Sequence, residues 1–145
     1  MYSLLKKPAL AFLLLIVLLQ SCRVAWVPDY NAAIEDQIIA TAQKNDRLYL
    51  DMLHGSAPAN YVLYSDRYND IQSEINSIEL KNEARRKNED MLSIIKNLKN
   101  AFKEYRKEHE AKKILKDGEL LIYQQNIKAF WTPLLVAEHG LKLAK

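Results

Sequence analysis

The sequence contains one cysteine, three glycines and four prolines in 145 residues. A single cysteine excludes an intramolecular disulfide, and it also excludes the metal sites and haem attachments that need several thiolates. Three scattered glycines form no phosphate-binding loop, and no nucleophile-elbow motif surrounds a serine. Strict alternation of apolar and polar residues, the pattern of a half-buried strand, is missing as well. The chain is therefore expected to be helical.

The chain also lacks a large excess of charge of one sign. Its net charge is +3, and it falls to +1 without the first 21 residues, which contain Lys6 and Lys7. We therefore expect no nucleic-acid partner. The charges are unevenly distributed, with −6 over residues 29–80 and +6 over residues 81–116. We interpret these blocks as antiparallel helices that attract each other; the alternative is a basic face for an acidic ligand or lipid headgroups.

No apolar run is long enough to span a membrane. The longest run is 11 residues, from Ala9 to Leu19, whereas a spanning helix needs about 20. Lys6 and Lys7 precede it, and small or polar residues follow it. This layout is typical of a secretory signal peptide.

The run ends in Leu-Gln-Ser-Cys, residues 19–22, which resembles the lipobox of bacterial lipoproteins in the Leu-x-Ser-Cys form of Bacteroidota. The resemblance covers the first 22 residues. It implies that residues 1–21 are a signal peptide cut off before Cys22, and that Cys22 carries palmitate-type acyl chains. Residues 22–28 would then be a lipidated tether for a helical domain of residues 29–145. The alternative is a plain secretory signal followed by an unmodified cysteine.

Four stretches of the remaining chain carry inward-facing residues at alternating spacings of three and four, as amphipathic helices do. Short connections place neighbouring helices antiparallel. We predict an all-α fold, an antiparallel up-down-up-down four-helix bundle that follows the cleaved signal peptide. The four stripes are Ile34, Ile38, Thr41, Asn45, Leu48 and Met52; Tyr61, Tyr64, Tyr68, Ile71, Ile75 and Ile78; Met91, Ile95, Leu98, Phe102, Tyr105 and His109; and Leu120, Tyr123, Ile127, Phe130, Leu134, Ala137 and Leu141.

Capping and turn residues mark the helix boundaries. Asp29 or Asn31 suits the start of the first helix, and Gly55 suits the position after its end, within a turn at residues 54–60. Polar residues 81–90 predict a break between the second and third helices, with one continuous helix as the alternative. Another turn is predicted at residues 116–119, and Pro133 predicts a kink in the fourth helix.

Polar residues on the inward stripes are the places where a catalytic or metal site would show. We interpret Thr41, Asn45 and His109 as structural, and we expect His109 to be partly exposed because it ends its stripe. The Glu-x-x-His pairs of a di-iron bundle and the His-Glu-x-x-His motif of zinc proteases are missing. We therefore expect no metal, no cofactor and no enzymatic activity.

Aromatic residues are the candidates for contact with a partner or ligand. Tyr61, Tyr64 and Tyr68 follow one seam, where they form either plain core or an aromatic groove. Phe130 lies on the fourth stripe, so its neighbour Trp131 is expected on the flank of the helix. There Trp131 would belong to an interface or fill the gap beside Pro133.

These observations favour a lipid-anchored helical bundle that acts as a non-enzymatic protein-interaction module in the cell envelope. Its partners would be the membrane, through Cys22, and an envelope protein or a second copy of the chain. Arg23 replaces the Asp that retains enterobacterial lipoproteins in the inner membrane, and no acidic surface-export signal follows Cys22. Both points favour the periplasmic face of the outer membrane. The alternative function is a periplasmic carrier that binds a small or apolar ligand within the bundle.

Overall fold

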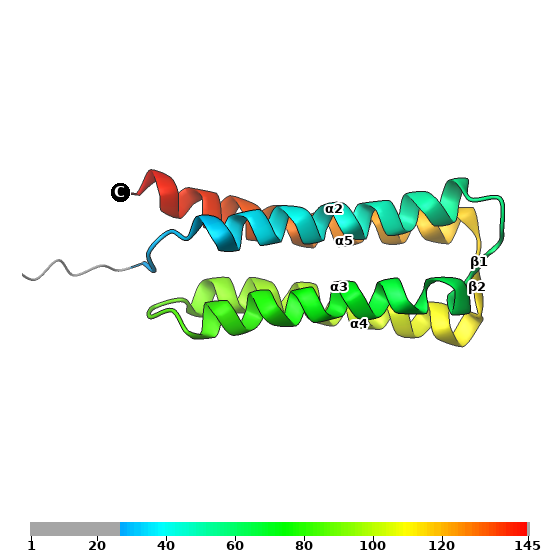
Figure 1. The fold of residues 1–145 in the computed structure, drawn as a ribbon, viewed down its shortest axis with the longest axis horizontal. Coiled ribbons are helices and arrows are strands. Elements are labelled where there is room, and N and C mark those ends of the chain that lie inside the picture. Colours follow the sequence, from blue (N-terminus) through cyan, green and yellow to red (C-terminus); the bar gives the residue numbers. More distant parts are fainter. Residues whose placement is uncertain (1–26, 145) are drawn as a thin grey trace, which may run out of the picture.

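The computed structural model describes residues 27–144, so the predicted signal peptide, lipobox and Cys22 lie outside the described residues. Within this range the chain forms the predicted all-α bundle of four antiparallel helices (Figure 1). No helix of residues 27–144 is long and apolar enough to cross a membrane. The elements in chain order are α2 (Ala32–His54), β1 (Ala59–Asn60), α3 (Tyr61–Glu83), α4 (Glu89–Lys112), β2 (Ile114–Leu115) and α5 (Asp117–Leu143).

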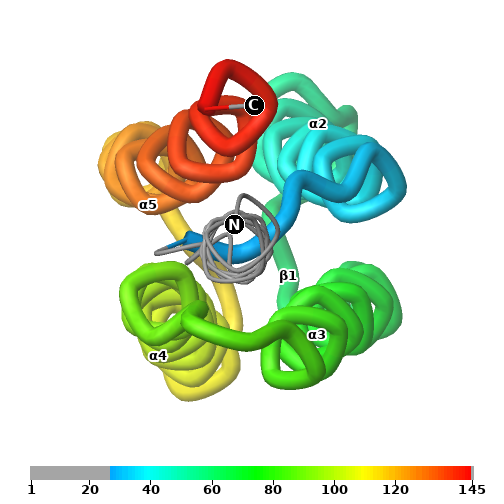
Figure 2. Tube along the Cα trace, turned by 90° about the vertical axis from the view of Figure 1, so that its left-hand side faces the viewer, coloured from blue at the N-terminus to red at the C-terminus, as the bar shows by residue number. Residues whose placement is uncertain are grey.

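The helices form a ring in the order α2, α3, α4 and α5, which closes where α5 packs against α2 (Figure 2). Residues 27–31, the α3–α4 connection and the end of α5 lie at one end of the bundle, which we call the terminal end. The α2–α3 and α4–α5 connections meet at the other end, which we call the crossover end. There β1 pairs antiparallel with β2. These strands depart from the expected absence of strand, because two residues are too short to show alternation.

The first three stripes predict the core well. Every member of the first stripe is buried, and the second and third stripes depart only at Tyr64 and Tyr105, which are half-buried. The side chains of the four helices meet along the bundle axis and form one apolar core. Burial of this continuous stripe on each helix is what holds the bundle together.

The fourth stripe is confirmed at Leu134 but is wrong at Phe130 and Ala137. Trp131 is 4% exposed and Glu138 is 0% exposed, whereas the predicted core residues Phe130 and Ala137 are only half-buried. Trp131 therefore does not stand on the flank. The physical reason is helical periodicity: a spacing of 3.5 residues, followed over several turns, drifts away from the 3.6 residues per turn of a straight helix. The buried positions of α5 are Leu120, Tyr123, Ile127, Trp131, Leu134 and Glu138.

The predicted break between the second and third helices is confirmed, so the alternative of one continuous helix is wrong. α3 ends at Glu83, α4 begins at Glu89, and Lys87 between them has a positive φ of 57°. The buried Asn88 donates from Nδ2 to the backbone oxygen and to Oδ1 of Asn82, at 2.8 and 2.9 Å. Side-chain amides thus close this turn without glycine or proline.

The other boundaries agree with the sequence pattern within a few residues. Asn31 caps α2, because its Oδ1 accepts hydrogen bonds from the backbone N–H groups of Ala33 and Ile34. The turn predicted at residues 116–119 is wrong by three residues, because α5 begins at Asp117 and the connection from α4 covers residues 113–116. α5 also continues through Pro133, which lies inside the helix on its exposed side.

Gly55 and Gly140 are expected to respond in opposite directions to substitution with alanine. A Cβ at Gly55 would lie 2.5 Å from the backbone oxygen of Asp51, whereas a Cβ at Gly140 would meet nothing within 4 Å. Gly55→Ala should therefore lower the free energy of unfolding by more than about 1 kcal/mol. Gly140→Ala should raise it by about 0.5–1 kcal/mol, because alanine favours a helix interior. Urea denaturation followed by circular dichroism measures both, and equal effects would contradict the described turn.

Candidate functional site

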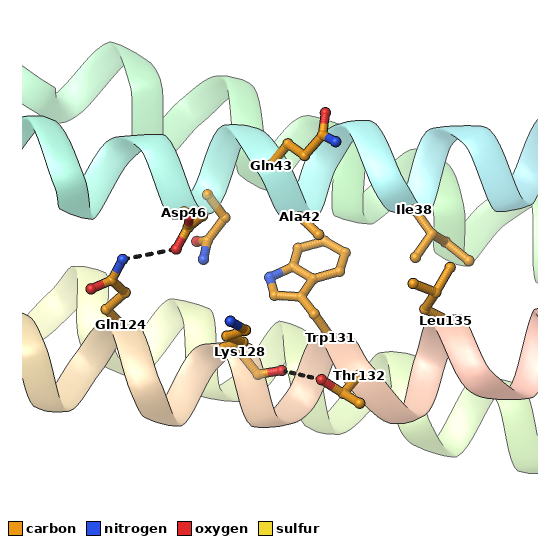
Figure 3. Close-up of a pocket in the computed structure, with 10 residues that line it drawn as sticks. Ile38, Ala42, Gln43, Asp46, Gln124, Lys128, Trp131, Thr132 and Leu135 are labelled. Atoms are coloured by element: carbon orange, nitrogen blue, oxygen red, sulfur yellow. Dashed lines mark hydrogen bonds between the residues drawn. The ribbon is translucent and has the colours of Figure 1, made fainter.

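A lateral pocket of about 250 Å³ opens between α2 and α5, the first and last helices of the described chain. Its floor and apolar wall come from the inward and flanking positions of these helices, and polar side chains form its rim. Figure 3 shows Trp131 lying across the pocket between the two helices. The pocket is lined by Ile38, Ala42, Gln43, Asn45, Asp46, Gln124, Lys128, Trp131, Thr132 and Leu135.

Two buried polar atoms of this pocket make no hydrogen bond within the described part of the chain. They are Nε1 of Trp131, a donor, and Oδ1 of Asn45, an acceptor. Trp131 is 4% exposed and Asn45 is 2% exposed, so bulk water does not solvate them freely. Buried polar groups are normally paired, and an unpaired one costs about 1–3 kcal/mol. The described residues contain three other such atoms, the hydroxyl oxygens of Tyr49 and Tyr123 and Oδ1 of Asn88, but only Asn45 and Trp131 line this pocket.

The rim of the pocket carries both signs of charge and one bridge between its helices. Gln124 of α5 donates from Nε2 to Oδ1 of Asp46 of α2, at 2.8 Å. Lys128 lies one turn further along α5 and is exposed. The opposite charges of Asp46 and Lys128 favour neither an anion nor a cation.

A second buried polar group lies at the crossover end and contains His109, which is 0% exposed. The expected partial exposure of His109 is wrong, because the β1–β2 crossing covers the end of α4. Nε2 of His109 lies 2.8 Å from the backbone oxygen of Ala59, and Nδ1 lies 3.1 Å from the hydroxyl of Tyr68. A carbonyl oxygen only accepts, so Nε2 carries the proton of the neutral ring and Nδ1 accepts from Tyr68.

The rings around His109 form a tight aromatic cluster. Tyr61 stacks on Tyr68 with the ring centroids 5.9 Å apart, and Phe102 lies 5.8 Å from Tyr68. The ring of Tyr61 meets His109 edge-on at 5.5 Å. These side chains fill the space between α3 and α4, so the cluster is core and not an open aromatic groove.

Acidification should destabilise the bundle through His109. Burial lowers the pKa of His109 below its usual 6.5, although its hydrogen bond to Ala59 opposes this shift. As the pH falls below 6.5, the unfolded chain takes up this proton before the folded chain does. The stability contributed by neutral His109 is therefore present above pH 6.5 and is lost progressively below it, by at most about 1.4 kcal/mol per pH unit.

Urea denaturation between pH 7 and pH 5 measures this loss. The substitution His109→Gln, which keeps a donor for Ala59, should flatten the dependence of stability on pH. The matched control His54→Gln removes a histidine at an exposed position on the last turn of α2. An equal slope in all three proteins would refute the assignment. Two carboxylates do not contribute in this pH range. Contact with Lys44 lowers the pKa of Glu74 although burial opposes this shift, and contact with Lys112 lowers the pKa of Glu119, so both take up protons only below about pH 4.5.

A third cluster joins three segments at the terminal end around the buried carboxylate of Glu138. Arg85, in the α3–α4 connection, donates from Nη1 to Oε2 of Glu138 at 2.6 Å and from Nη2 to Oε1 at 3.3 Å. The backbone N–H of Asn31 donates to Oε1 of Glu138 at 3.0 Å. Arg85 also donates to Oδ1 of Asn82 at 3.0 Å and to the backbone oxygen of Asp29. Every charge in this cluster is paired, so it is a structural clamp.

The five aromatic residues predicted as contacts do not form one site. Tyr61 and Tyr68 are buried beside His109, and Tyr64 is half-buried and donates from its hydroxyl to the backbone oxygen of Asp51 at 3.3 Å. Phe130 is half-buried on α5, and only Trp131 lines the lateral pocket. Trp131 was expected on the flank of its helix, and the structure buries it instead.

Sequence reasoning gave Asn45 a structural role and missed Glu138 altogether. Asn45 is on the predicted first stripe, but nothing in its spacing indicates that its oxygen lacks a partner. Nothing in the sequence marked Glu138 as buried, because a charged residue among apolar neighbours is normally exposed.

Within residues 27–144, one ion pair joins the acidic block of residues 29–80 to the basic block of residues 81–116. It lies between Glu79 of α3 and Lys99 of α4.

Residues 27–144 contain no cluster of three or more His, Cys, Asp or Glu side chains that could hold a metal ion. No family model, no curated protein and no solved structure matches the chain. The fold and the site define an all-α four-helix bundle with a filled interior and a lateral pocket.

Proposed function

We propose that the protein is a non-enzymatic protein-interaction module held in the cell envelope by a lipid on Cys22. The observation that carries this proposal is the exposure of large apolar side chains at the crossover end. Val62 is 72% exposed, and the other members of this set are at least one-third exposed. We call the set the crossover residues: Leu50, Val62, Leu63, Ile114, Leu121 and Ile122. They come from α2, α3, β2 and α5, four of the elements that end or begin at the crossover end, and exposed apolar surface of this kind supports a protein-binding role.

The position of the crossover residues suits an anchored module. Residue 27 leaves the bundle at the terminal end (Figure 1), and α2 alone is about 35 Å long at 1.5 Å per residue. A lipid on Cys22 would hold the terminal end near the membrane. The crossover residues would then face away from the bilayer, where an envelope protein or a second copy of the chain can reach them.

Crosslinking in intact cells, followed by pulldown from membranes, tests the interaction. The triple variant Val62→Ser, Leu63→Ser, Ile122→Ser should lose the crosslinked partner. The matched control Leu80→Ser, Val136→Ser, Leu143→Ser removes three exposed apolar side chains outside the crossover residues and should keep it. A heavier band composed only of this chain would identify the partner as a second copy. If the triple variant at Val62, Leu63 and Ile122 still crosslinks to the partner, the proposed binding surface is wrong.

Membrane fractionation tests the anchor separately. Cys22→Ala should move the chain from the membrane fraction to the soluble periplasmic fraction, because stable attachment needs the acyl chains. The released protein should still bind its partner in solution, since the crossover residues are unchanged. A Cys22→Ala protein that stays in the outer-membrane fraction would contradict lipid anchoring and the proposed location at the periplasmic face of that membrane.

A further inference from the structure

We propose that the lateral pocket between α2 and α5 binds a small neutral molecule that carries a hydroxyl group on a compact apolar body. This inference does not depend on the crossover residues or on the anchor. Binding of a small molecule is the alternative function considered in the sequence analysis. The pocket, however, lies between α2 and α5 and not at the tyrosines of α3.

The hydroxyl group follows from the two unpaired atoms. Nε1 of Trp131 needs an acceptor, and Oδ1 of Asn45 needs a donor. A hydroxyl group both donates and accepts, so a single group satisfies either atom or both. A hydrocarbon would leave both atoms unpaired. A group that only accepts would satisfy Trp131 alone, and a group that only donates would satisfy Asn45 alone.

The apolar body follows from the rest of the lining. Ile38 and Ala42 of α2 face Leu135 and the indole ring of Trp131 on α5 (Figure 3). A volume of about 250 Å³ exceeds the 150 Å³ apolar cavity that accommodates benzene. It is smaller than the usual 300–1,000 Å³ of sites for drug-sized ligands. The pocket therefore fits a molecule with one ring or a short branched chain.

The preference for a neutral molecule follows from the rim. Asp46 already accepts a hydrogen bond from Gln124, and Lys128 places the opposite charge on the same rim. A charged ligand would gain attraction to one of these side chains and repulsion from the other. Neutral solutes avoid this conflict, and they also avoid the desolvation that a buried charge would require.

Benzyl alcohol and ethylbenzene are the matched probes, because they have the same size and differ in the hydroxyl group. The ¹⁵N-labelled protein is titrated with each probe, and the indole N–H resonance of Trp131 is followed by NMR. Trp26 is the other indole, and the spectrum of Trp131→Phe assigns the two. Benzyl alcohol should bind saturably, at least tenfold more tightly than ethylbenzene, and should shift the Trp131 resonance.

Two variants locate the hydroxyl group. In Trp131→Phe and in Asn45→Leu, the preference for benzyl alcohol over ethylbenzene should fall at least threefold. Tyr123→Phe removes a buried hydroxyl from α5 outside the pocket and should keep the full preference. Circular dichroism verifies that each variant is folded. If a variant does not fold, the shift map of the unmodified protein still tests the site.

Each other outcome would overturn the proposal. Shifts that do not saturate mean that the pocket takes up water only. Equal affinity for the two probes means that the unpaired atoms select nothing. Shifts centred on α3 and α4 place the binding elsewhere in the bundle.

Discussion

Replacing Arg85 with alanine is expected to lower the free energy of unfolding by about 3–5 kcal/mol. The reason is the position of its partner: Glu138 is 0% exposed, so neither water nor another cation replaces the guanidinium that pairs with it. The same substitution removes the hydrogen bonds from Arg85 to Asn82 and to the backbone of Asp29. The α3–α4 connection and the start of α2 would lose their shared contact. Urea denaturation at pH 7 measures the loss.

Two companion variants separate the buried charge from the mere removal of a long side chain. Arg86→Ala removes the exposed side chain of the next residue and should change the free energy of unfolding by less than about 0.5 kcal/mol. The double variant Arg85→Met, Glu138→Leu removes both charges and should recover most of the stability lost in Arg85→Ala. A double variant as unstable as the single one would show that hydrogen bonds, and not an unpaired charge, dominate the cluster.

Phe102→Ala is expected to cost about 3–5 kcal/mol of unfolding free energy. The ring is 0% exposed and packs against Tyr68 in the aromatic cluster around His109. Its removal leaves a cavity between α3 and α4 that the remaining rings cannot fill without breaking the hydrogen bond from Tyr68 to His109. A loss of this size is a large fraction of the stability of a domain of this length.

The comparison for Phe102→Ala is a matched series. Phe102→Leu keeps most of the volume and should cost less than half as much. Ile122→Ala, at a half-exposed position on α5, should change stability by less than about 0.5 kcal/mol. The comparison requires that the free energy of unfolding decreases with urea concentration at the same slope in every variant. A loss below about 1.5 kcal/mol for Phe102→Ala would mean that the cluster is not tightly packed.

The architecture could be predicted from the spacing of apolar residues. Ile34, Ile38 and Leu48 on α2, and Ile71, Ile75 and Ile78 on α3, are buried as their periodicity requires. The periodicity failed on α5 because Phe130 and Trp131 are both large, apolar and adjacent. Spacing alone cannot choose between two such neighbours, and the packing of α5 against α2 decides in favour of Trp131.

The candidate site could be predicted much less well, because it depends on contacts between distant segments. Asn45 and Trp131 come together only when the ring of helices closes, and their unpaired atoms are a property of that packing. His109 is buried by the crossing of β1 and β2, two strands too short to show in a pattern. Glu138 is buried because Arg85 reaches it across 53 positions of sequence.

The closure of the ring by its first and last helices has a consequence for the newly made chain. A polypeptide truncated before α5 contains three of the described helices and only one wall of the lateral pocket. Affinity for benzyl alcohol can then appear only once the carboxyl-terminal helix has docked. Binding in the lateral pocket would therefore report that α5 has packed against α2.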